Sequence, residues 1–180
     1  MYIDGVTNNI YNNDMKKEVT QAIESFHIPS WQEIPEIGLY LDQVSKYINT
    51  FLVQFPEMNV TPSMISNYAK QKLISRVNKK TYTRQQIATL ILIVLFKNVT
   101  SIDHIRTYLQ QMEKQNVETE KMYEQFRAIL LSTTSKQKNL FHPEDELLSA
   151  IAVALSRKMY VEKVFESMKD WQSCIFVHDF

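Results

Sequence analysis

The stretch TPSMISNYAKQKLISRVNKKTYTRQQIATLILIVLF, residues 61–96, decides the fold because it holds two marked helix starts joined by a basic connector. The first start is Thr61 followed by Pro62, which is typical of a capping residue with proline at the first helical position. It predicts a helix over 62–73, with apolar residues on one face and small, hydrogen-bonding or cationic residues on the other.

The second start is Thr83 with Gln86, which together form a capping box. This cap indicates that the apolar run 87–96 is a helix, because periodicity alone would also allow a buried strand. The run is apolar nearly all round, so we expect it to be the central and most buried element. The connector 74–82 fits either a short two-stranded wing or a plain loop.

Charge is distributed unevenly in a chain whose formal net charge is zero. Residues 1–57 hold three basic and eight acidic side chains, net −5, and residues 103–180 hold ten basic and twelve acidic ones, net −2. Residues 58–102 hold seven basic side chains and no acidic one, net +7. Such asymmetry indicates a polyanionic partner, and a merely solvated basic face is the plainer alternative.

Helical periodicity of apolar residues recurs outside this stretch. After an asparagine-rich arm, further helices are expected at about 14–26, 39–55, 101–114, 115–131 and 144–171. We divide the chain into an N-terminal arm with a short helix (1–30), a helix-turn-helix domain (31–114) and a C-terminal helical region (115–180).

Composition excludes several classes of protein. Two glycines in 180 residues disfavour hairpin-rich sheets and glycine-dependent phosphate loops. The single cysteine, Cys174, cannot form an internal disulfide, which fits a reducing compartment. The longest apolar run is about half the length that a bilayer crossing needs. We therefore expect a soluble, cytoplasmic protein of the all-α class.

The polar face of the helix at 62–73 suits duplex DNA. A major groove admits one α-helix, and short polar side chains let its backbone approach the base edges. Asn67 is of the type that pairs with adenine, and Lys70 of the type that binds guanine or a phosphate. Free N–H groups at the helix start also favour a phosphate. The candidate DNA-binding residues are Thr61, Ser63, Ser66, Asn67, Lys70, Lys72, Arg76, Lys79, Lys80 and Arg84.

Other chemistry is weakly represented. The histidines lack metal-ligand spacing, and no nucleophile elbow, paired-cysteine motif or nucleotide-binding loop occurs. We therefore expect no enzyme activity, no catalytic residue, no metal and no cofactor. Aromatic and methionine residues over 108–171 are interpreted as core, with a ligand pocket as the alternative.

The order of signals resembles the winged helix-turn-helix of MerR-type bacterial transcription regulators. There, a tyrosine-rich recognition helix ends in a glycine–leucine–leucine sequence, a wing closes on a tyrosine followed by serine or threonine, and a buried helix follows. The matching positions are Tyr68, Leu73, Ile74, Tyr82, Thr83, Ser101, Ile102 and Ile105. Residues 31–112 look still more like a bacterial family of unknown function, usually regarded as MerR-like, with the hallmarks LYLDQV, TPSMI-NY-K and KKxYxRxxIAxL.

The chain also departs from the MerR pattern. Ser66 stands where that family carries arginine, Asn67 replaces its first tyrosine, and Lys72 replaces its glycine. The helix before the turn is expected to be longer than usual, so specific base contacts cannot be transferred.

The resemblance implies an all-α, MerR-like winged helix-turn-helix with a C-terminal helical extension. It also implies a sequence-specific transcription regulator that binds double-stranded DNA as a homodimer, with a small-molecule effector left open. The alternative is a helical protein–protein interaction module that never binds DNA.

Overall fold

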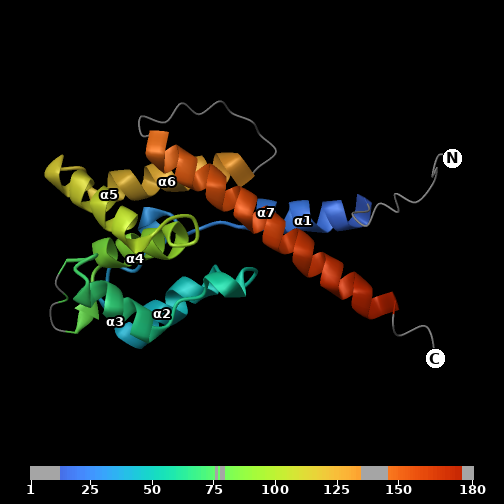
Figure 1. Cartoon of the computed structure of the whole chain (residues 1–180). Helices are drawn as coiled ribbons and strands as arrows, with labels where there is room; N and C mark the ends of the chain where they lie inside the picture. The colour runs from blue at the N-terminus through green and yellow to red at the C-terminus, as the bar shows by residue number, and fades with distance from the viewer. Residues whose placement is uncertain (1–12, 76, 78–79, 135–145, 176–180) are drawn as a thin grey trace.

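The computed structural model describes residues 13–75, 77, 80–134 and 146–175, the last seven by their backbone alone, and this part of the chain is mostly helical (Figure 1). The helices are α1 (Asn13–Ser25), α2 (Leu41–Thr50), α3 (Pro62–Lys70), α4 (Arg84–Phe96), α5 (Ile102–Lys114), α6 (Thr119–Thr134) and α7 (Glu146–Ile175). Single turns of 3-10 helix lie at η1 (Trp31–Glu33) and η2 (Pro56–Met58), and two short strands at β1 (Leu39–Tyr40) and β2 (Thr81–Tyr82). The arm before residue 13 lies outside the described residues.

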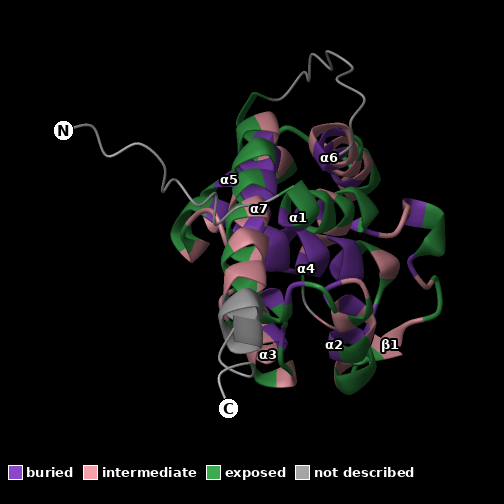
Figure 2. Ribbon diagram, turned by 90° about the vertical axis from the view of Figure 1, so that its right-hand side faces the viewer, coloured by how far each residue is buried: buried purple, intermediate pink, exposed green. Residues whose placement is uncertain are grey.

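Helix α4 occupies the centre of the fold, as its all-round apolar sequence predicts (Figure 2). Ten of its thirteen residues are buried, and from Leu90 to Phe96 every side chain is fully enclosed. Its start is set by the expected capping box, in which the Thr83 hydroxyl accepts from the Gln86 backbone and the Gln86 side chain accepts from the Thr83 backbone. The burial of α4 makes it the support against which the other helices are placed.

The prediction of a helix over 39–55 is wrong at both ends. Leu39 and Tyr40 form β1 and pair in antiparallel register with Tyr82 and Thr81 of β2, so α2 begins only at Leu41. A local pattern cannot reveal this pairing because the partner strand lies about forty residues further along the chain. The helix also ends early, at Thr50, and the segment before Pro56 forms turns.

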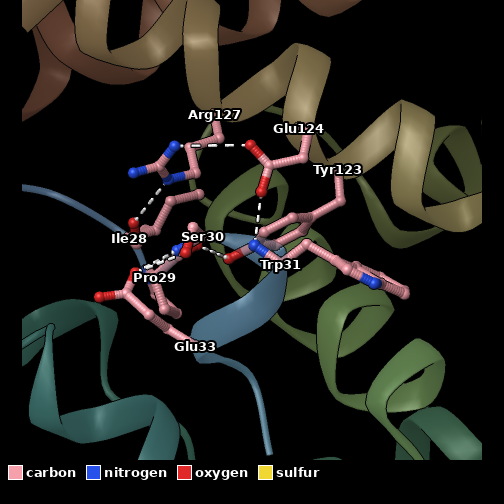
Figure 3. A network of polar contacts seen from close by, with 8 residues as sticks. All are labelled: Ile28, Pro29, Ser30, Trp31, Glu33, Tyr123, Glu124 and Arg127. Atoms are coloured by element: carbon pink, nitrogen blue, oxygen red, sulfur yellow. Dashed lines mark hydrogen bonds and ion pairs between the residues drawn. The ribbon is translucent and has the colours of Figure 1, made fainter.

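The segment before η1 is tied to α6 by a cluster of polar contacts (Figure 3). The Tyr123 hydroxyl donates to the Pro29 carbonyl at 2.7 Å, and Arg127 Nε donates to the Ile28 carbonyl at 3.1 Å. Glu124 accepts from the Trp31 backbone N–H. Burial raises the pKa of Tyr123, so its phenol stays a donor. This cluster fixes the path of the connector that leads into β1.

Helix α7 runs from Glu146 to Ile175 without a break and packs against α1 and α6 (Figure 1). Leu148, Ala152, Leu155 and Met159 are completely enclosed along its inner face. Among its described side chains, Val153, Val161 and Phe165 are large, apolar and exposed on the outer face. Leu147, near the start of the helix, is also exposed.

The sequence analysis divided the chain into residues 1–30, 31–114 and 115–180. One continuous core joins all three parts, since its buried residues run from Ile23 to Met159. The interpretation of the aromatic and methionine residues as core is confirmed for Met122, Tyr123, Phe126 and Met159. It is wrong for Phe165, whose side chain is exposed.

Candidate nucleic-acid interface

Helix α3 is anchored by its cap and by its inner face. The Thr61 hydroxyl accepts from the Met64 backbone at 3.2 Å, and Pro62 follows at the first helical position. Ile65 is fully enclosed and Tyr68 is 5% exposed, so both pack into the core. Burial raises the pKa of Tyr68, which keeps its phenol neutral.

The opposite face of α3 points to solvent. Ser63, Asn67 and Lys70 are exposed and Ser66 is half-buried, in the order expected for one helical face. No acidic residue lies on this helix. The structure thus places on one outward face the small, hydrogen-bonding or cationic residues that the sequence analysis expected there.

The turn between α2 and α3 is bridged by a side chain at the end of α2. The Asn49 amide donates to the Val60 carbonyl at 3.0 Å and accepts from the Val60 N–H at 2.9 Å. Val60 is 1% exposed, so water has little access to these backbone groups. Asn49 is a positioning residue that the sequence analysis missed, because the two groups it bonds, the N–H and carbonyl of Val60, lie eleven residues away.

Helix α3 ends in a Schellman motif. The Leu73 N–H bonds to the Tyr68 carbonyl at 3.0 Å, and the Lys72 N–H to the Ala69 carbonyl at 3.1 Å. Lys72 therefore adopts the left-handed region, with φ of 57°, where glycine is the usual residue. The helix is shorter than the expected 62–73, because this motif turns the chain after Lys70.

The candidate cations differ in their surroundings. Lys70, Lys72 and Lys80 are exposed, and Lys80 also has a positive φ, of 62°. Arg76 and Lys79 lie outside the described residues. Whether the connector forms a wing is answered only in part. Strand β2 closes the connector by pairing with β1, but residues 76 and 78–79 are not described.

Arg84 is engaged within the chain. Its Nε donates to the Ile34 carbonyl at 2.9 Å, its guanidinium lies 5.9 Å from the Trp31 ring, and Glu36 is 3.9 Å away. These contacts fix the connector before β1 to the start of α4. The sequence analysis counted Arg84 among the candidate DNA-binding residues and did not foresee these contacts, because the partners are distant in sequence.

Arg106 of α5 is a cation near α3 that sequence reasoning missed. It donates to the Gln71 side chain at 3.0 Å, just after α3, and pairs with Asp103 on its own helix. Together with Lys70 and Lys72 it lines a groove of about 830 Å³ between the end of α3, the connector, α4, α5 and α6. Arg106 lies outside the acid-free segment in sequence, so only folding brings it to that surface.

Other kinds of site find little support in the described part of the chain. Among those residues, no group of three or more histidine, cysteine or carboxylate side chains could hold a metal ion. His142 and His178 are not described. The helices that are described include none with the length and apolar character needed to cross a membrane.

Comparison with known proteins gives one match. Neither the curated proteins nor the solved structures contain a match to this chain. A family model described as Domain of unknown function (DUF1836) matches residues 29–126, from the connector before η1 to the middle of α6. That span is more than half of the chain and includes α2, α3 and α4 entire. The chain therefore belongs to the DUF1836 family.

Proposed function

We propose that this protein is a transcription regulator that binds duplex DNA in a sequence-specific manner through α3. The observation that carries the proposal is the outer face of α3, where Ser63, Asn67 and Lys70 stand in solvent on a helix fixed at both ends. A nine-residue helix is roughly 14 Å long, which suits insertion into a major groove.

The order of elements supports a MerR-like winged helix-turn-helix. Strand β1 leads into α2, a turn leads to α3, and the connector returns through β2 beside β1 to the buried helix α4. Lys72 adds to this support, since it occupies the position of the MerR-type glycine and has a backbone that favours glycine. The Asn49 contacts with Val60 supply the rigid turn that such a unit needs.

Phosphate contacts are assigned to exposed cations around α3. Lys70, Lys72 and Lys80 are exposed and have no acidic neighbour in sequence. Arg106 lies close by on α5, but it is half-buried and already bonded to Asp103 and Gln71, so it is not counted among them. Such contacts position a protein on DNA without reading sequence, and each releases counterions. Asn67 is assigned to base reading, because its amide can bond an adenine edge with two hydrogen bonds.

Fluorescence anisotropy of labelled duplexes tests the proposal, with the target first selected from a random-sequence pool. The affinity should fall steeply as salt rises, and Lys70→Ala with Lys72→Ala should weaken binding to all duplexes and flatten the salt slope by about 2. The matched control is Lys17→Ala with Lys114→Ala, which removes the same charge from exposed positions on α1 and α5.

Asn67→Ala should instead relax the preference at one or two base pairs, worth about 1–3 kcal/mol for a bidentate contact. A flat salt dependence, equal effects of the two lysine pairs, or unchanged specificity in Asn67→Ala would each count against DNA recognition by α3.

A homodimer is part of the same proposal. Regulators of this shape generally bind two half-sites, whose symmetry mirrors that of the protein. The exposed apolar side chains of α7 supply an apolar face for a second copy, and Val153, Val161 and Phe165 follow one another along it. Sedimentation equilibrium should show a species of twice 21.2 kDa at micromolar concentration. A 21.2 kDa species that persists through a tenfold rise in concentration would exclude the dimer.

The second candidate function is a helical protein–protein interaction module, and it is favoured by the same exposed face of α7. It differs from the first in one measurable way. For an interaction module, Val161→Asp with Phe165→Asp abolishes partner binding, and the cations around α3 can be neutralised without effect.

A further inference from the structure

A second concave site lies on the other side of α5 from the groove that Lys70, Lys72 and Arg106 line. A cavity of about 710 Å³ opens between α5, the start of α6 and the first turns of α7. Ligand pockets typically measure about 300–1,000 Å³, whereas packed interiors hold few voids larger than a water molecule. The cavity is therefore of a size for a small molecule and is not a packing defect.

The lining of the cavity is mainly apolar. Its inner wall holds Phe96 of α4 with Ile105 and Tyr108 of α5, which are 0%, 1% and 6% exposed, so these side chains close the cavity but offer almost no surface for stacking. Ile151 contributes from α7. Leu147, also on α7, lines the same cavity with 55% of its surface exposed. A leucine exposed to this extent beside an apolar wall indicates a binding surface more than a solvated face.

The polar groups of the cavity are mostly uncharged. Gln111, Gln115 and Gln125 each carry an amide with both donors and acceptors. His104 is bonded to the Thr100 hydroxyl through Nδ1 at 2.9 Å. Among charged side chains, the cavity has one lysine, Lys121, and one glutamate, so no single sign of charge prevails.

We propose that this cavity binds an uncharged, mainly apolar small molecule with hydrogen-bonding groups at one end. Its apolar part would lie against Leu147, Met112 and Val117, which are only partly covered, and its polar end would meet the glutamine amides. Burial of apolar surface supplies the affinity, and the amides fix the orientation. This site is separate from α3, so the proposal stands whether or not the protein binds DNA.

Nile red, a neutral, flat aromatic dye with a carbonyl acceptor, is the probe for the full chain. Its emission should rise and shift to shorter wavelength, saturating at one dye per chain. Two substitutions should fill the cavity from opposite walls: Leu147→Trp from α7 and Thr107→Trp from α5. We expect each to weaken dye binding at least tenfold, and the use of two guards against one variant failing to fold.

Val161→Trp is the matched control. Val161 lies fourteen residues after Leu147 on the same helix, is 49% exposed, and does not line the cavity. Its affinity for Nile red should stay within twofold of the wild type. The anionic dye anilinonaphthalene sulfonate should bind more weakly than Nile red, because no prevailing positive charge faces the cavity.

Three results would overturn the proposal. The first is no saturable Nile red binding by the wild type at micromolar concentration. The second is wild-type affinity in folded Leu147→Trp and Thr107→Trp, which would place the dye outside the cavity. An equal loss of affinity in Val161→Trp would count in the same way, because Val161 does not line the cavity. The third is tighter binding of the anionic dye, which would contradict the uncharged class of ligand.

Discussion

Lys72→Gly should make the protein more stable and at the same time a poorer DNA binder. Lys72 has φ of 57° at the end of α3, where two backbone hydrogen bonds hold it. A residue with a Cβ in this region costs roughly 1–2 kcal/mol relative to glycine. Glycine loses more backbone entropy on folding, by about 0.5–1 kcal/mol. The net gain in the free energy of unfolding is therefore about 0–1.5 kcal/mol.

The effect on DNA affinity has the opposite sign. If Lys72 neutralises one phosphate, its loss should reduce the slope of log affinity against log salt by about 0.9. Urea denaturation followed by circular dichroism measures the stability, and fluorescence anisotropy at several salt concentrations measures the affinity.

Two controls separate the contributions. Asn116→Gly makes the same backbone change at the end of α5, where φ is 56°, without removing a charge. It should raise stability by less, because asparagine already tolerates this region, and leave affinity unchanged. Lys72→Arg keeps the charge and should keep the salt slope. A Lys72→Gly variant that is less stable than the wild type would refute the backbone argument, and one with an unaltered salt slope would remove Lys72 from the interface.

Three further predictions concern positions that hold the fold together. Asn49→Ala leaves the enclosed N–H and carbonyl of Val60 unpaired, so it should lower the free energy of unfolding in urea by about 2–4 kcal/mol. Asn59→Ala, at an exposed site nearby, is the control and should change that free energy by less than about 0.5 kcal/mol. Tyr123→Phe removes a buried hydrogen bond and should lower the free energy of unfolding by about 1–3 kcal/mol. Hydrogen bonds from Ser30 lower the pKa of Glu33 below 4.5, so its carboxylate stabilises the fold at neutral pH and this stabilisation is lost as the pH falls through the folded pKa. The stability difference between wild type and Glu33→Gln should therefore shrink as the pH is lowered from 6 to 3.

The sequence by itself determined the helical class, the two caps and the buried centre. These are local features: Thr61 and Thr83 bond to groups three residues away, and the apolar run of α4 has no polar face to present. The outward side of α3 also followed from helical spacing, since Ile65 and Tyr68 had to face the core.

The tertiary structure alone decided what depends on partners distant in the chain. The β1–β2 pairing shortened α2, Arg84 was drawn to Ile34 fifty residues away, and Arg106 was brought beside Gln71. The cavity beside Leu147 arises in the same way, because α5, the start of α6 and the first turns of α7 line it together. Sequence periodicity reports only which face of an element is apolar, whereas these contacts are set by the packing of whole elements against one another.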